Sequence, residues 1–231
     1  MAIPKKTVSC QICTNKSSCF RKLSLPELDL VDKNRLEVVY NKGETILKQG
    51  SFASSILFLK KGLLKLYIEG KNNKNLIISI VPEGNLIGLP SLFGDPIFHY
   101  SAMAYEESTV CLIDMEMFRK FSMENAKFSA EVIHIINQST ICSYDRFFSI
   151  SQKNIPGRFA DLILYLSEKI YKTEKFAFPL SRKDFADLAS ISIESLSRVI
   201  KEFNDDKIIY MHGKEIEILD PQLLRRISEN G

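Results

Sequence analysis

The spacing of apolar residues changes along the chain and predicts successive regions of different structure. Residues 1–22 are mostly polar and form a short arm that carries three cysteines. Between Leu23 and Val38 the apolar residues Leu28, Val31 and Leu36 recur at helical spacing. This pattern predicts one helix over the whole segment.

From about Tyr40 to Met115 the pattern changes to short apolar runs separated by turn residues such as Gly62 and Gly84. The runs rich in leucine or β-branched residues are Thr45–Leu47, Ser55–Leu59, Leu63–Ile68, Asn75–Ile80 and Val110–Ile113. Many short strands at nearly regular spacing predict a β-barrel or a sandwich-like roll.

A long stretch without glycine or proline follows, from about Phe128 to Lys153. Its apolar residues fall near helical spacing at Val132, Ile136, Phe147 and Ile150. A helix of roughly 25 residues is about 37 Å long, more than a small domain needs. The helix could pack along its own domain, but we favour a dimer seam, because an amphipathic helix must bury its apolar stripe. The polar residues Ser139 and Ser143 would weaken such a seam.

The C-terminal part has the pattern of a helix-turn-helix. After a helix predicted over Phe159–Tyr171, Ser181 can cap a short helix over Arg182–Ala189. The turn Ser190-Ile191-Ser192 follows, and Ser192 is a good N-cap for a second helix. Two short helices joined by a three-residue turn predict this DNA-binding geometry.

The second helix is expected to have one buried and one exposed face. Its apolar residues at helical spacing are Ile193, Leu196, Ile200 and Phe203, and its polar face carries Glu194, Ser197, Arg198 and Lys201. The alternating runs Ile208–Met211 and Glu215–Ile218 flank His212-Gly213-Lys214 and predict the hairpin of a winged helix.

The polar face of this second helix suits the DNA major groove. Arginine can bond guanine through two hydrogen bonds, glutamate can accept from cytosine, and serine can bond a base or a phosphate. An intrahelical ion pair between Glu194 and Arg198 is the alternative, but the helix–turn–helix–hairpin context favours DNA contact. Ser181 and Arg182, at the opening of the first helix, are further candidates for DNA contact.

Composition and charge set loose limits on function. The chain has 231 residues and a net charge of +3, with 45% apolar and 26% charged residues, as in ordinary globular proteins. Without a run of roughly 18–20 apolar residues or a signal peptide, we expect a cytoplasmic protein with no membrane partner. We expect no enzyme, because a phosphate-cradling glycine loop, a Ser-His-Asp order and a histidine-based metal motif are absent from the sequence.

The cysteines are the strongest chemical signal. Cys10, Cys13 and Cys19 lie close together, Cys111 lies far downstream, and Cys142 falls within the long helix, where we expect it to pack. In a reducing compartment such a cluster favours a metal or redox site over disulfides. Four thiolates suit an iron–sulfur cluster or zinc, whereas a disordered tail and an ordinary buried Cys111 are the alternatives without a metal.

The chain resembles the Crp/Fnr superfamily of bacterial transcription regulators over nearly its whole length. The resemblance rests on the glycines of the β region, the stretch Pro82-Glu83-Gly84-Asn85-Leu86-Ile87-Gly88, the long helix, and the segment from Leu180 to Asp187. It implies an α+β fold with a cyclic-nucleotide-binding-like β-roll, a long dimerisation helix and a winged helix-turn-helix. The expected boundaries are an arm at 1–22, a sensory β-roll at 23–127, the dimer helix at 128–154 and the DNA-binding domain at 155–231.

Two motifs resemble the branch of fumarate and nitrate reduction regulators. Glu194-Ser195-Leu196-Ser197-Arg198 matches its Glu-x-x-Ser-Arg motif, which implies a homodimer bound to a palindrome of the TTGAT–ATCAA type. The Cys-x-x-Cys-x5-Cys arm and the lone strand cysteine match that branch's cluster ligands. By this resemblance Cys10, Cys13, Cys19 and Cys111 would hold an oxygen- or redox-labile (4Fe-4S) cluster.

Other ligands of the superfamily fit the sequence less well. Where the resemblance places a nucleotide-binding glutamate and arginine, this chain has Gly88–Phe93 and Tyr100-Ser101, so cyclic AMP is not expected. His99 and His134 are the histidines of the sensory half, and haem or another small ligand is the alternative if no cluster is bound. The turn Gly94–Tyr100 aligns with a loop that implies contact with RNA polymerase.

Overall fold

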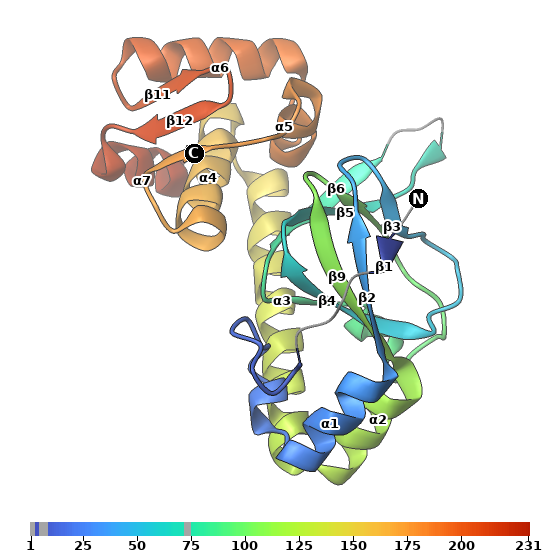
Figure 1. Cartoon of the computed structure of the whole chain (residues 1–231). Coiled ribbons are helices and arrows are strands. Elements are labelled where there is room, and N and C mark those ends of the chain that lie inside the picture. The colour runs from blue at the N-terminus through green and yellow to red at the C-terminus, as the bar shows by residue number, and fades with distance from the viewer. Residues whose placement is uncertain (1–2, 5–8, 72–74) are drawn as a thin grey trace. The chain divides into compact units, whose positions relative to one another are not determined.

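The chain folds into two compact units, residues 1–140 and 141–231, and the boundary falls inside the long helix α3 (Ala126–Gln152). The computed structural model describes residues 3–4, 9–71 and 75–231 (Figure 1). In this described part, no helix is long and apolar enough to cross a membrane.

The first unit is built from two antiparallel sheets, as expected for a β-roll. One has the order β1 (Ile3–Pro4), β2 (Arg35–Tyr40), β9 (Ser108–Asp114), β4 (Ser55–Lys61) and β7 (Leu86–Ile87). The other has the order β3 (Thr45–Leu47), β8 (Ser101–Ala104), β5 (Leu63–Ile68) and β6 (Leu76–Pro82). The expected strands are all present, whereas β1, β2, β7 and β8 were not expected from the apolar pattern.

The core of this unit lies between the sheets and extends into a cluster of phenylalanines at one end. Ile56, Leu59 and Leu64 are fully buried strand residues. The ring of Phe128 lies 5.0 Å from Phe118 and 5.9 Å from Phe20, measured between centroids. Since Phe20 follows Cys19 directly, the end of the cysteine arm is part of the core. The alternative of a disordered tail therefore does not apply to this end of the arm.

The helix expected over residues 23–38 is only partly correct. Helix α1 covers Leu25–Asn34 and begins with a capping box between Ser24 and Glu27, after the short 3-10 turn η1 (Phe20–Lys22). From Arg35 onward the chain is strand β2, which pairs with β9 in register. Long-range pairing therefore overrides the local helical spacing, and Leu36 is exposed instead of joining Leu28 and Val31 in the core.

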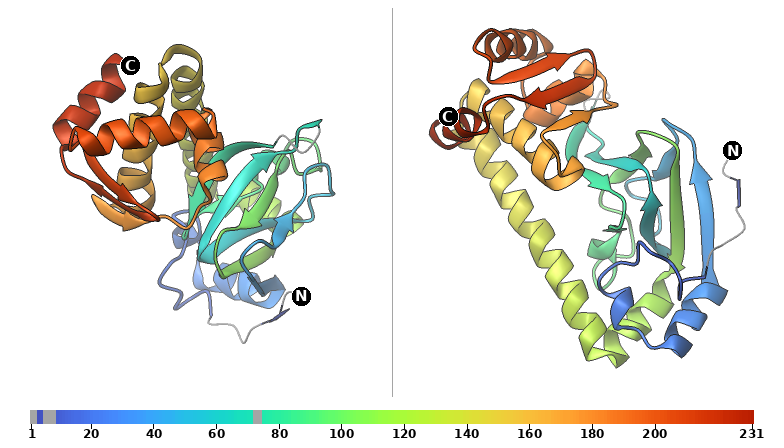
Figure 2. Two further views of the ribbon diagram at one scale, coloured as in Figure 1. Left: turned by 90° about the horizontal axis from the view of Figure 1, so that it is seen from above. Right: turned by 60° about the vertical axis from the view of Figure 1, so that its left-hand side comes forward.

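Two helices follow the β-roll. Helix α2 (Met115–Glu124), which the apolar pattern did not predict, lies beside α1 at one end of the strands (Figures 1 and 2). Helix α3 begins two residues before the expected start, and it buries Phe128 and Val132 in its first turns. Its later apolar side chains are exposed on the chain, namely Ile133, Ile136, Ile141, Tyr144, Phe147 and Phe148. Cys142 is also exposed on the single chain, so its expected packing stays a prediction for the dimer seam.

The second unit is a winged helix-turn-helix. It consists of α4 (Ile155–Tyr165), the π-helical turn η4 (Leu166–Tyr171), β10 (Lys175–Ala177), α5 (Arg182–Ala189), α6 (Ile193–Asp205), β11 (Ile209–His212), β12 (Glu215–Ile218) and α7 (Pro221–Asn230). The expected helix Phe159–Tyr171 corresponds to α4 and η4, and Phe159 is fully buried with its ring 5.1 Å from Phe203. The wing strands β11 and β12 pair, and β10 adds a third strand.

The buried face of α6 differs from expectation at one position. Leu196, Ile200 and Phe203 are buried as expected, together with Val199, but Ile193 is 44% exposed. Ile193 is the first residue of the helix after the Ser192 cap, where the chain has not yet reached the core of the unit.

Candidate metal centre and nucleic-acid interface

Three of the four expected cluster ligands line one pocket in the first unit. This pocket, called the cysteine pocket below, has Cys10 and Cys13 from the arm and Cys111 from β9. Its remaining lining residues are Lys16, Phe20, Val31, Arg35, Phe58, Lys60 and Ile113. Two segments far apart in the sequence thus bring sulfur atoms to a mainly apolar cavity, whose lining also includes three cationic side chains.

Cys19 does not line this pocket. Its side chain is fully buried, and the Ser17 hydroxyl lies 3.4 Å from its Sγ. Within the described residues, no group of three cysteine, histidine, aspartate or glutamate side chains is close enough to hold a metal ion. A bound metal would therefore require the arm around Cys13 and Cys19 to rearrange.

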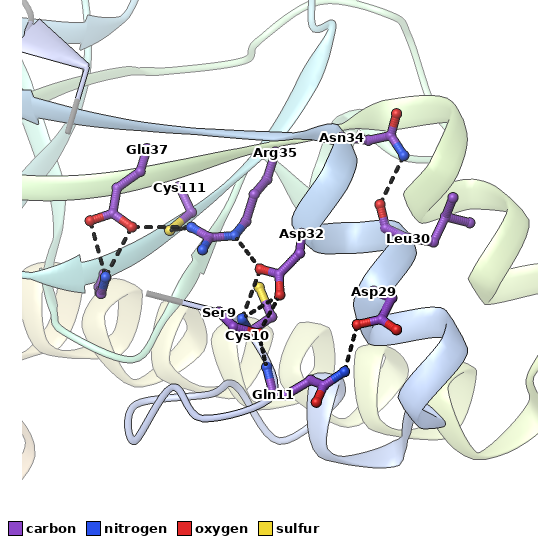
Figure 3. Close-up of polar contacts among 11 residues, drawn as sticks. Ser9, Cys10, Gln11, Asp29, Leu30, Asp32, Asn34, Arg35, Glu37 and Cys111 are labelled. Atoms are coloured by element: carbon purple, nitrogen blue, oxygen red, sulfur yellow. Dashed lines mark hydrogen bonds and ion pairs between the residues drawn. The ribbon is translucent and has the colours of Figure 1, made fainter. Parts of the chain in front are cut away.

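A network of charged groups surrounds Cys10 and Cys111 (Figure 3). Asp32 on α1 accepts hydrogen bonds from the backbone N–H of Cys10 at 2.7 Å and from the Ser9 hydroxyl at 2.5 Å. Arg35 donates through Nε to Asp32 at 3.1 Å and through Nη1 to Cys111 Sγ at 3.3 Å. Asp32 therefore attaches the arm to α1, and Arg35, at the start of β2, connects Asp32 with Cys111 on β9.

The same network contains a buried carboxylate with two cationic partners. Glu37 on β2, only 3% exposed, accepts from Arg35 Nη1 at 3.1 Å and from Lys60 Nζ at 2.9 Å. The backbone carbonyl of Lys60 accepts from Asn15 in the arm at 3.2 Å. Sequence reasoning did not find this network, because Arg35 and Glu37 fell within the segment expected to be helical.

Three of these thiols, Cys10 and Cys111 in the pocket and Cys19 outside it, favour the protonated form. Burial, with a hydrogen bond to Asp32, raises the pKa of Cys10 to about 12, and burial raises the pKa of Cys19 to about 11. Burial also raises the pKa of Cys111, although the charge of Arg35 opposes it. Because thiolate is the metal-binding form, a metal ion must displace these protons when it binds.

The donor set fits a cluster in its chemistry. Sulfur ligands in an apolar cavity with nearby cations are suited to an anionic metal–thiolate group. Tetrahedral zinc accepts the same thiolates, so the residues by themselves fit both metals. His99 and His134, the residues considered for haem, are exposed and are not part of the pocket lining.

The positions considered for cyclic AMP are engaged in contacts within the chain. The Tyr100 hydroxyl accepts a hydrogen bond from the backbone N–H of Gly88 at 2.9 Å. The Ser101 hydroxyl donates to Glu69 at 2.6 Å and accepts from the backbone N–H of Gln49 at 2.9 Å. A carboxylate beside Ser101 is unsuited to a phosphate, since like charges repel.

In the second unit, α6 presents the expected polar face. Glu194, Ser197, Arg198 and Lys201 are all exposed. Ser197 donates to the carbonyl of Ile193 at 3.0 Å, and Arg198 Nη2 donates to Ser195 Oγ at 3.2 Å. A hydrogen bond from its own backbone N–H at the helix start, with Ser192 and the charge of Arg198, lowers the pKa of Glu194.

The short helix α5 precedes this face. Ser181 caps α5 by accepting from the Asp184 N–H at 3.1 Å, and Arg182 is exposed in its first turn. Sequence reasoning missed Ser195, which is mostly buried and accepts a hydrogen bond from Arg198, because a single serine within a helix gives no signal of its own.

Comparison with known proteins identifies both units. The model of the cyclic nucleotide-binding domain matches residues 37–125, and that of the Crp-like helix-turn-helix domain matches residues 157–227. Together the two matches cover more than half of the chain.

Curated relatives match nearly the whole chain. The chain is 25% identical to the fumarate and nitrate reduction regulatory protein of Vibrio cholerae, over 96% of this chain and 90% of that protein. It is 23% identical to the transcriptional activator protein FnrA of Stutzerimonas stutzeri, over 94% of this chain and 91% of that protein. These relatives are regulators of transcription, in agreement with the expectation of a protein that is not an enzyme.

Solved structures show the same fold. FixK2 from Bradyrhizobium japonicum superposes with a TM-score of 0.77 at 18% identity, covering 84% of this chain and 96% of that one. A putative Crp/Fnr-family regulator from Eubacterium rectale gives 0.72 at 16% identity, with 92% and 98% covered. The two matched domains and these relatives show that the chain belongs to the Crp/Fnr family of DNA-binding transcription regulators.

Proposed function

We propose that this regulator binds DNA under the control of an oxidant-labile (4Fe-4S) cluster held by Cys10, Cys13, Cys19 and Cys111. The observation that carries this proposal is that Cys10, Cys13 and Cys111 line one pocket, although β9 is remote from the arm in sequence. The fourth ligand, Cys19, lies near Cys10 and Cys13 in the sequence and would join the other three through a rearrangement of the turn at residues 17–19.

The cluster would supply a link between the arm and the β-roll that oxidants can break. The arm also contacts the start of α3, because Lys22 lies 3.5 Å from Glu131. A change in the arm can therefore reach the helix that we assign to the dimer seam. The arm also has anchors of its own, since Phe20 is in the core and Asp32 accepts a hydrogen bond from Cys10.

Control of DNA binding would act through dimerisation. The exposed apolar side chains of α3 suit a seam with a second copy of the chain. In such a dimer, two copies of α6 would enter successive major grooves about 34 Å apart, on a palindrome of the TTGAT–ATCAA type. Glu194, Ser197 and Arg198 are the residues that we assign to base contacts, and Lys201, Ser181 and Arg182 are assigned to further DNA contacts.

The test is anaerobic purification followed by analysis of iron and sulfide. We expect near-stoichiometric iron and sulfide and a visible colour that bleaches when air is admitted. Cys13→Ser should lose the cluster, whereas Cys142→Ser, which changes an exposed cysteine on α3, should keep it. A colourless wild-type protein that contains zinc would overturn the cluster and support a structural metal site instead, with DNA binding retained.

A further inference from the structure

We propose that Arg35 is a positioning residue for the metal centre, which orients Cys111 and compensates the negative charge of the bound cluster. This inference rests on the function proposed above and adds a residue that the cysteine pattern does not reveal. Arg35 is the first residue of β2, and its side chain is only 3% exposed.

The geometry fixes the direction of the guanidinium group. Two carboxylates hold it, with Asp32 3.1 Å from Nε and Glu37 3.1 Å from Nη1. The same Nη1 also donates to Cys111 Sγ at 3.3 Å (Figure 3). A planar guanidinium offers several donors in fixed directions, so these partners determine which way the remaining N–H bonds point.

The charge balance of the pocket gives Arg35 a purpose beyond packing. Four thiolates carry more negative charge than an iron–sulfide core carries positive charge, so the bound group is an anion. Much of the pocket lining is apolar, with Phe20, Val31, Phe58 and Ile113. An anion placed there is costly unless a cation is hydrogen-bonded to it. Arg35 already makes such a bond to one of the sulfur ligands.

Arg35 also connects the two segments that carry the ligands. Asp32, which holds its Nε, accepts the N–H of Cys10 at 2.7 Å. One ion pair therefore positions a cysteine of the arm and the cysteine of β9. Lys60 bonds Glu37 at 2.9 Å, as Arg35 does at 3.1 Å, but it is Arg35 that also donates to Cys111 Sγ.

The experiment compares wild type with Arg35→Gln, Arg35→Lys and a control, Arg119→Gln. Arg119 belongs to the same unit and bonds Glu116 and the Leu92 carbonyl, but it does not line the cysteine pocket. Arg35→Gln takes the cation from Asp32 and leaves Glu37 with Lys60 alone, so circular dichroism checks its folding. Arg35→Lys keeps a charge for Glu37, but one ammonium cannot replace the guanidinium contacts to Asp32, Glu37 and Cys111 together.

Two probes are measured under anaerobic conditions. The first is the rate at which a chelator removes iron after reconstitution with iron and sulfide. The second is the affinity for Co²⁺ alone, followed through the thiolate-to-cobalt absorption band. We expect Arg35→Gln to weaken retention of iron and binding of Co²⁺ roughly 10–100-fold, with Arg35→Lys intermediate and Arg119→Gln unchanged.

The outcomes separate this inference from the proposed function. A wild-type cluster that Arg35→Gln retains equally well overturns the role of Arg35 and leaves the cluster proposal standing. Wild-type protein that binds Co²⁺ through thiolates but assembles no iron–sulfur cluster overturns the cluster proposal, and the Co²⁺ affinities then decide the role of Arg35. Wild-type protein that binds neither probe overturns both.

Discussion

Arg198 Nη2 donates to Ser195 Oγ at 3.2 Å, one turn earlier on α6, and Ser195 is mostly buried. The acceptor is fixed in turn, because Ser192 Oγ lies 3.2 Å from Ser195 Oγ. The side chain assigned to base recognition is therefore oriented before DNA binds. Preorientation reduces the conformational entropy that a long side chain loses in a complex.

This relationship predicts that Ser195→Ala weakens base discrimination while the helix remains intact. The Ser192 cap accepts the backbone N–H of residue 195, which alanine retains. We expect a loss of about 0.5–1.5 kcal/mol in discrimination, the net value of one hydrogen bond. Competition binding with single-base variants of the half-site measures it. Ser195→Thr keeps the hydroxyl and should preserve discrimination; equal discrimination by the alanine variant would contradict the role of Ser195.

Removal of Arg198 itself should have a larger and more local effect. We expect Arg198→Ala to abolish preference at one base pair, at a cost of about 1–3 kcal/mol for the preferred sequence. Binding to a set of palindromes that differ at each position is the measurement. A uniform loss on every sequence would mean that Arg198 contacts phosphate instead of a base.

Local patterns predicted much of this fold because several elements are determined by nearby residues. Strand β5 and helix α5 have the expected bounds, since a leucine-rich run next to a glycine and a serine cap are signals within a few residues. Strand β2 was mistaken for the end of a helix because its conformation depends on pairing with β9, far away in sequence. Likewise, the exposure of Ile193 depends on where the core of the second unit ends.

The cysteines of the candidate metal site could be proposed from the sequence, whereas their surroundings could not. The spacing of Cys10, Cys13 and Cys19 is visible in the sequence, because the ligands are close together. The bond between Arg35 and Cys111 joins two paired strands, and no local pattern indicates it. The burial of Cys19, away from the pocket, likewise depends on packing of the arm against the core.

The loop at Gly94–Tyr100 allows a test of the proposed contact with RNA polymerase. Ile97 is partly exposed within it, and Phe93 before it is 66% exposed, so these side chains are available to a partner. We expect Ile97→Ala and Phe93→Ala to reduce activation of transcription in vitro with little change in affinity for the palindrome. Loss of both activation and DNA binding would refute a contact role for this loop.

Glu27 predicts a dependence of stability on pH. Partial burial raises its pKa, but hydrogen bonds from Ser24 and Asn125 together outweigh this, so the pKa lies below its ordinary value of 4.5. A carboxyl whose pKa is lower in the folded state stabilises the fold above its unfolded pKa, and this contribution disappears as pH falls through the folded value.

The stability advantage of wild type over Glu27→Gln should therefore be constant above about pH 5 and should shrink below about pH 4.5. Urea unfolding followed by circular dichroism at several pH values measures this difference. Glu106→Gln, at an exposed turn before β9, is the control and should show no such change. A Glu27→Gln difference that stays constant down to pH 3 would contradict the assigned role of the Ser24 hydrogen bonds.

The apolar side chains of α3 predict how strongly the chain dimerises. Phe147 is 74% exposed on the chain, so Phe147→Asp should remove a large apolar contact and place a charge in the seam. Burial of such a side chain contributes about 1.5–3 kcal/mol, which corresponds to at least a tenfold weaker dimer. Gln138 lies nine residues earlier, two and a half turns away and thus on the opposite side of the helix, so Gln138→Asp is the matched control.

Ser139 and Ser143 interrupt this apolar surface, so we expect the wild-type protein without a metal to dimerise weakly. Analytical ultracentrifugation should then show a monomer–dimer equilibrium at micromolar concentration for the metal-free protein and a shift toward dimer after anaerobic reconstitution. The shift would mean that the arm acts on α3, as its contact with Glu131 suggests. Metal-free protein that is fully dimeric at this concentration would instead place the control of DNA binding at a step after dimerisation.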